Sequence, residues 1–136
     1  NNLITTGVIP EKLNIDGVVA ENCNRLIITK DMKERKHVLR KESDAFIAMP
    51  GGFGTLEEIL EVITLKQLQY HKKPIVLLNS YGFYDHLIEH FDKIFEDGFA
   101  ENNYRSLFSI SKTTYDAIQL IEQYEHKPVY DKYLKR

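Results

Sequence analysis

Residues 46–58 read Phe46-Ile47-Ala48-Met49-Pro50-Gly51-Gly52-Phe53-Gly54-Thr55-Leu56-Glu57-Glu58. An apolar run passes through a turn with three glycines into a segment with the apolar spacing of a helix. Such a turn leaves backbone N–H groups available at the helix start, where the helix dipole also favours negative charge. Glycines permit positive φ and let a ligand approach the backbone closely. The turn therefore predicts an anion site at a helix N-terminus.

Two observations limit what this turn establishes by itself. It matches neither the GxGxxG fingerprint of dinucleotide-binding proteins nor the GxxxxGK[ST] fingerprint of P-loops. Glycine-rich turns are also common as plain connections between a strand and a helix. From the residues alone, a tight turn without a ligand therefore stays open beside the anion site.

On either side of the turn, short apolar runs alternate with amphipathic segments, as in βαβ units. Strands are expected at 7–9, 26–29, 45–49, 75–78 and 107–110, and helices at 31–43, from Thr55 to about 70, 84–97 and 113–124. Continuous hydrophobicity predicts strands covered on both faces. We expect a single Rossmann-like α/β domain over residues 1–136, with three α/β/α layers and a mostly parallel sheet.

The composition narrows the class of protein. Hydrophobic residues make up 43% and charged residues 28%, as in globular rather than disordered chains. The net charge of −2 argues against a nucleic-acid partner, which would require a basic excess. The single cysteine, Cys23, cannot form an intrachain disulfide, so a cytoplasmic setting is expected. No apolar run approaches the roughly 20 residues that cross a bilayer, so no membrane partner is expected.

Two segments match sequence elements of a single protein family. Residues 50–58 match its PGGxGTxxE signature. Residues 32–36, Met32-Lys33-Glu34-Arg35-Lys36, match its MxxRK element. By these two elements the chain resembles the LOG (Lonely Guy) family, long mislabelled as lysine decarboxylases. The likeness extends from about residue 7 to the last predicted helix. The resemblance implies hydrolysis of the N-glycosidic bond of a nucleoside 5′-monophosphate, typically a cytokinin riboside 5′-monophosphate, to free base and ribose 5-phosphate.

The resemblance also implies roles for individual residues. Glu58 would hold the ribose hydroxyls and stabilise the positive charge that develops at C1′. Arg35 would lie near the leaving base or the ribose, and its permanent charge makes it a poor proton donor. Substrate and phosphate contacts are expected from Gly51, Gly52, Gly54, Thr55, Met32 and Lys36. No metal or organic cofactor is implied.

Family members dimerise and often build the site from both subunits, so a homodimer is expected, with the apolar face of the helix after Thr55 as its contact. The family also has an earlier glycine-rich loop after its first strand. No such loop precedes Leu3, so we expect the N-terminal βα portion to lie upstream of residue 1. Two alternatives remain: a non-catalytic nucleotide or molybdopterin carrier, and a general AMP salvage nucleosidase. The presence of both Arg35 and Glu58 disfavours the carrier.

Both candidate catalytic residues have a competing structural explanation. The segment Thr55-Leu56-Glu57-Glu58 fits a capping box, in which Thr55 is the N-cap and Glu58 reaches back to it from the third helical position. Arg35 lies on a segment rich in lysine and arginine and fits a solvated surface charge. The family signature favours the catalytic interpretation of both residues.

Two further signals are set aside. Residues 86–90 fit the HxxEH zinc pattern, but the apolar residues between and after the two histidines occupy the buried face. We therefore expect His86 and His90 to face solvent. A pyridoxal-phosphate decarboxylase would need a buried Schiff-base lysine, whereas Lys66 and the pair Lys72-Lys73 are expected in polar surroundings.

Overall fold

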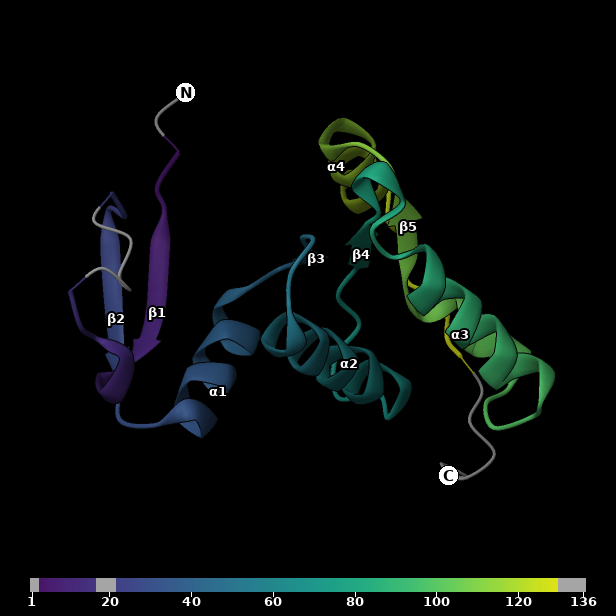
Figure 1. Ribbon diagram of the computed structural model, residues 1–136, viewed down its shortest axis with the longest axis horizontal. Coiled ribbons are helices and arrows are strands. Elements are labelled where there is room, and N and C mark those ends of the chain that lie inside the picture. The colour runs from purple at the N-terminus through teal and green to yellow at the C-terminus, as the bar shows by residue number, and fades with distance from the viewer. Residues whose placement is uncertain (1–2, 17–21, 130–136) are drawn as a thin grey trace. The chain divides into compact units, whose positions relative to one another are not determined.

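The computed structural model of this chain describes residues 3–16 and 22–129 (Figure 1). The chain divides into two compact units, residues 1–43 and residues 44–136. Strands and helices alternate in both, and all the strands pair in parallel, as the apolar pattern predicts. Within the described part of the chain, no helix is long and apolar enough to span a membrane.

The first unit is a two-stranded parallel sheet followed by a helix. Strand β1 (Thr6–Pro10) pairs with β2 (Arg25–Thr29), and the short 3₁₀ helix η1 (Glu11–Leu13) follows β1. The helix α1 (Met32–Glu42) then packs against both strands. Its bounds agree with the predicted helix over 31–43.

Local hydrogen bonds explain where α1 begins. The side chain of Asp31 accepts a hydrogen bond from the backbone N–H of Glu34 at 2.8 Å. The carboxylate of Glu34 in turn accepts from the N–H of Lys30 at 2.8 Å. Two backbone donors at the helix start are thereby satisfied by acidic side chains, which the helix dipole also favours.

The prediction that continuous apolar strands are covered on both faces is wrong for β2. Leu26 and Ile28 on this strand are exposed in the structure. The physical reason is that one described helix, α1, packs on this sheet within the first unit, so it leaves part of the strand surface bare. Apolar composition alone does not report which face finds a partner.

The second unit is a three-stranded parallel sheet in the order β3-β4-β5 (Figure 1). The strands are β3 (Phe46–Ala48), β4 (Ile75–Leu78) and β5 (Ser109–Ser111). The helices are α2 (Phe53–Gln67), α3 (Asp85–Glu96) and α4 (Thr114–Glu122), with short 3₁₀ helices η2 (Ser80–Gly82) and η3 (Asn102–Leu107). The strand predicted at 107–110 starts at Ser109, because Leu107 ends η3 and is buried there.

Strand β4 is the centre of three layers. Its Ile75 and Leu77 belong to a core with residues of α2 and with partly buried residues of α3. Its Val76 and Leu78 point to the other face and pack on Ala117 of α4. Because successive side chains of a strand alternate between faces, a continuous apolar strand needs helices on both sides. The second unit therefore has the predicted α/β/α layering.

Candidate functional site

The glycine turn joins the carboxyl end of β3 to the start of α2. Gly52 is the N-cap of the helix, and no side chain caps it. The first helical hydrogen bond there runs from the N–H of Leu56 to the carbonyl of Gly52 at 3.1 Å. The N–H groups of the first turn therefore lack helical acceptors, which is the arrangement that binds phosphate at helix N-termini. In parallel sheets, ligands bind at this carboxyl edge.

The three glycines of the turn differ in what they require. A Cβ on Gly51 would overlap the hydroxyl of Thr55, so packing demands glycine at this position. A Cβ on Gly52 or on Gly54 would meet no described atom within 4 Å. None of the three has the positive φ that the sequence suggested, since among described residues only Gly82 and Gly98 are glycines of that kind. Gly52 and Gly54 thus leave a bare backbone surface that a ligand can approach.

The capping-box explanation of Glu58 is wrong. The helix begins at Phe53 with Gly52 as its N-cap, three residues before the predicted N-cap at Thr55. Glu58 is therefore the sixth helical residue, whereas a capping box uses the third. Its side chain is half-buried, while that of its neighbour Glu57 is exposed. A capping box therefore does not account for the glutamate at this position.

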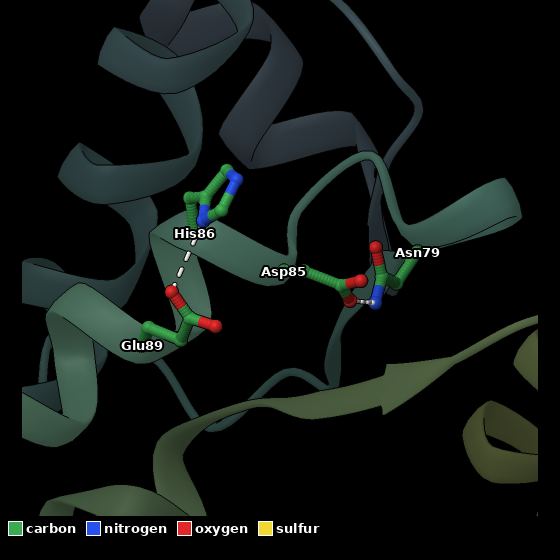
Figure 2. A network of polar contacts seen from close by, with 4 residues as sticks. All are labelled: Asn79, Asp85, His86 and Glu89. Atoms are coloured by element: carbon green, nitrogen blue, oxygen red, sulfur yellow. Dashed lines mark hydrogen bonds and ion pairs between the residues drawn. The ribbon is translucent and has the colours of Figure 1, made fainter.

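A partly buried hydrogen-bond network supports the strand that leads into the turn. Tyr84, which is 1% exposed, donates from its hydroxyl to the carbonyl of Met49 at 2.5 Å. The N–H of Tyr84 donates to Oδ1 of Asn79 at 2.7 Å, and Nδ2 of Asn79 donates to Oδ1 of Asp85 at 2.7 Å (Figure 2). The N–H of Asn79 donates to the carbonyl of Ser111 at 2.7 Å. The ends of β3, β4 and β5 are thereby tied together.

Sequence reasoning did not identify Asn79, Tyr84 or Asp85 as parts of this region. One signal was available, because Asn79 directly follows the continuous apolar run of β4 and so lies at the carboxyl edge of the sheet. Burial raises the pKa of Tyr84, which keeps its hydroxyl protonated as a donor to Met49. The Tyr84 side chain therefore supports the turn through a fixed hydrogen bond to the backbone of Met49.

The MxxRK element lies on α1 in the first unit. Arg35 is half-buried, and its Nε donates to the carbonyl of Val8 on β1 at 3.0 Å. Lys36 is also half-buried, and Met32 is exposed. The three residues share a helix face, because positions three and four apart are neighbours. The alternative in which Arg35 is a solvated surface charge does not fit this anchored side chain.

The predicted site residues thus fall into two groups. Gly51, Gly52, Gly54, Thr55 and Glu58 are brought together by the turn and the first two turns of α2. Met32, Arg35 and Lys36 are brought together by α1.

The HxxEH histidines lie on α3, and both are exposed as expected. Nδ1 of His86 is 3.0 Å from Oε2 of Glu89 (Figure 2), and this contact raises the pKa of His86. Among residues 3–16 and 22–129, no group of three histidine, cysteine or acidic side chains has the geometry of a metal site. The contact between His86 and Glu89 is an ordinary one for residues three apart on a helix.

The prediction of polar surroundings for Lys66 is wrong. This residue of α2 is 5% exposed, and its Nζ donates to the carbonyl of Leu107 at 2.8 Å. The ammonium also lies 4.6 Å from the centre of the Tyr124 ring. Burial lowers the pKa of Lys66 to about 8. The burying residues come from η3 and the segment after α4, more than 40 positions away, so the local sequence could not reveal them.

Comparison with known proteins adds a second line of evidence. Residues 1–121 match the family model described as "Possible lysine decarboxylase". The chain is 42% identical over 125 residues to cytokinin riboside 5′-monophosphate phosphoribohydrolase LOG5 of Arabidopsis thaliana, covering 92% of this chain and 54% of that protein. It is 41% identical over 128 residues to probable cytokinin riboside 5′-monophosphate phosphoribohydrolase LOGL2 of Oryza sativa subsp. japonica, covering 93% and 52%. The chain therefore spans about half the length of these curated relatives.

Proposed function

Because this chain belongs to the LOG family, whose family model carries the description "Possible lysine decarboxylase", we propose that the protein is a nucleoside 5′-monophosphate phosphoribohydrolase. It would hydrolyse the N-glycosidic bond of a purine nucleotide, with adenine or an N6-modified adenine as the base. The observation that supports this most directly is the bare backbone at Gly52 and Gly54, at the uncapped start of α2. This surface suits the 5′-phosphate, which binds N–H groups of this kind.

The reaction needs one water and no redox step. The bond between C1′ and the base nitrogen breaks as water oxygen bonds to C1′, and the base departs with the electron pair and gains a proton. The ribose carries positive charge in the transition state, so an ionised carboxylate beside it lowers the barrier. We assign that role to Glu58, with contacts to the ribose hydroxyls.

We assign Arg35 to the leaving base or the ribose. A guanidinium is a permanent cation, so it would stabilise negative charge on the departing base rather than donate a proton. The hydrogen bond from its Nε to Val8 fixes the side chain against β1, which supports a positioning contact of defined geometry. Thr55, Gly51 and the two bare glycines would bind the phosphate, with Met32 and Lys36 as neighbouring contacts.

We extend the proposal to a homodimer whose active site draws on both subunits. Support comes from apolar residues that α2 leaves exposed, since Phe53 is 92% and Leu60 40% exposed. Apolar side chains gathered on one helix are typical of surfaces that bury against a partner. The single cysteine remains the basis for proposing a cytoplasmic location.

A product assay tests the proposed activity. The purified full-length protein is incubated with AMP and, separately, with N6-isopentenyl-AMP, and free base and ribose 5-phosphate are quantified by chromatography. Release from the prenylated nucleotide well above AMP is expected for a cytokinin-activating enzyme, whereas equal rates indicate general AMP salvage. Binding of both nucleotides without release of either base would contradict the proposal and favour a carrier.

A further inference from the structure

The C-terminal end of α2 borders a cavity with a basic lining. The cavity has a volume of about 120 Å³, well above the ~10–15 Å³ that holds one water. Its polar wall consists of Lys66, Gln69, His71, Lys72 and His126, and none of the described residues that line it is acidic. The remaining wall is apolar and includes Val129. All of these residues belong to the second unit.

Lys66 places a buried positive charge at this cavity. Its recorded partners are the carbonyl of Leu107 and the ring of Tyr124, and neither carries a net negative charge. A buried ammonium is costly unless its charge is compensated, and one neutral carbonyl compensates it in part. An ammonium group has three N–H donors, and the described hydrogen bond to Leu107 uses one of them.

Two titratable groups of the cavity, Lys66 and His126, have lowered pKa values. Burial lowers the pKa of Lys66 to about 8. Burial also lowers the pKa of His126, and the charges of Lys72 and Lys66 add to this effect. The side chains of Lys72 and His126 are exposed, so the cavity is open to ligands from solvent.

His71 contributes shape rather than charge. Its Nδ1 accepts a hydrogen bond from the N–H of Lys73 at 3.2 Å, so Nε2 carries the proton and donates to the carbonyl of Val62 at 2.9 Å. Both ring nitrogens are thereby engaged by the backbone. The cationic side chains that line the cavity are those of Lys66 and Lys72.

We propose that this cavity binds a small tetrahedral oxyanion, either inorganic phosphate or the phosphoryl group of a phosphate monoester. The ammonium groups of Lys66 and Lys72 hold it, and His126 donates a further hydrogen bond. Charge-assisted hydrogen bonds of this kind are about twice as strong as neutral ones. The anion supplies the negative charge that the buried ammonium lacks.

One opposing effect is smaller than this attraction. The C-terminal end of α2 carries about half a negative charge from the helix dipole, which disfavours an anion. Two lysine charges outweigh it. The cavity also differs from the glycine turn, because Gly52 and Lys66 lie at opposite ends of α2, about 20 Å apart at 1.5 Å per residue. The inference therefore does not depend on the proposed function.

Titration with inorganic phosphate, and in a second arm with ribose 5-phosphate, tests this site. The imidazole resonances of His126 report the pKa of that side chain by NMR in the full-length protein, at ionic strength held constant with chloride. We expect saturable shifts and a higher His126 pKa on binding of either anion. A site that recognises the phosphoryl group alone would respond to both phosphate and ribose 5-phosphate. A site that also needs the sugar would respond to ribose 5-phosphate only.

Calorimetric titration of variants adds an independent measurement. Lys72→Ala and His126→Ala alter exposed side chains, so both should fold, and Lys72→Ala should weaken phosphate binding at this site about tenfold. Lys112→Ala, an exposed lysine outside the cavity, is the matched control and should leave it unchanged. The site is refuted if the His126 pKa responds to neither phosphate nor ribose 5-phosphate more than to chloride, or if Lys72→Ala and Lys112→Ala give the same affinity. Neither result depends on nucleotide turnover.

Discussion

At the residue scale, Lys66 makes folding stability depend on pH. Its pKa is about 8 in the fold and about 10.4 in unfolded chains, so the unfolded state binds more protons between these values. The free energy of unfolding should therefore rise with pH in this window. We predict a gain on the order of 1–2 kcal/mol from pH 7.5 to 9.5, measured by urea denaturation in phosphate-free buffer with reductant.

The control for this prediction is Lys66→Met, which should abolish the gain. A gain of equal size in the variant would show that another group causes it. Burial raises the pKa values of Tyr84 and Tyr124, and this favours unfolding as pH rises through 10 and above. The measurement therefore stops at pH 9.5, before these tyrosines contribute.

The Tyr84 hydroxyl is predicted to contribute both to folding stability and to the conformation of the glycine turn. Tyr84→Phe removes the partly buried hydrogen bond to Met49, which costs about 0.5–1.5 kcal/mol. The looser turn should also raise KM for the nucleotide more than it lowers kcat. Denaturation and steady-state kinetics check both effects. Tyr81→Phe, at a fully exposed tyrosine, is the matched control. Equal stability and equal kinetic constants in the two variants would contradict a supporting role for the Tyr84 hydroxyl.

Residue-scale predictions from sequence depended on whether the deciding contacts were local. Arg35 and Glu58 were proposed as site residues from signatures that occupy a few consecutive positions. The burial of Lys66 and the hydrogen bond from Tyr84 to Met49 involve residues 41 and 35 positions away. Such contacts depend on the fold, so the spacing of apolar residues does not encode them.

At the element scale, α2 was predicted well as a helix and poorly at its start. Apolar spacing located the helix, but the capping-box pattern placed the N-cap at Thr55, whereas Gly52 occupies it. Phe53 and Gly54 are poor indicators of a helix start because neither caps it or belongs to the buried face. The error changed the interpretation of Glu58, which a capping role had seemed to explain.

The start of α2 gives a prediction that separates stability from binding. Gly54 has no positive φ, and a Cβ there would meet no described atom, so Gly54→Ala should stabilise the helix by about 0.5–1 kcal/mol. The added methyl group should nevertheless weaken nucleotide binding, because it occupies the surface assigned to the phosphate. Thermal denaturation and nucleotide titration measure the two effects.

The contrasting variant is Gly51→Ala, whose Cβ would overlap Thr55 and which should lose stability. If Gly54→Ala binds nucleotide as tightly as the wild type, the bare backbone is not a phosphate surface. A destabilised Gly54→Ala would instead show that the position is more crowded than the structure indicates.

At the scale of the whole molecule, the layered α/β architecture followed from the alternation of apolar runs and amphipathic segments. That pattern predicted the parallel pairing and the three layers around β4, whose apolar side chains pack on helices on both faces. It did not predict that Leu26 and Ile28 of β2 are exposed in the first unit. Whether a strand face is buried depends on which elements pack against it in the fold. The hydrophobicity of the strand's own residues does not identify those elements.

The proposed homodimer is a property of the assembled molecule and is tested on α2. We predict that Leu60→Asp converts a dimer to a monomer in size-exclusion chromatography with light scattering, because a charge buried at an apolar contact is costly. Leu120→Asp on α4 is the matched control, since Leu120 is 38% and Leu60 40% exposed. Dimers from both variants, or monomers from the wild type, would contradict the assignment of this contact.

Glu58 is proposed to stabilise positive charge on the ribose during cleavage of a nucleotide. The most direct test of this role compares Glu58→Gln with Glu57→Gln, which changes the adjacent exposed carboxylate, in the chromatographic assay with the preferred nucleotide. With both variants folded, the account predicts that Glu58→Gln lowers kcat at least ~100-fold and that Glu57→Gln stays within about twofold of the wild type. Wild-type turnover by folded Glu58→Gln would contradict it.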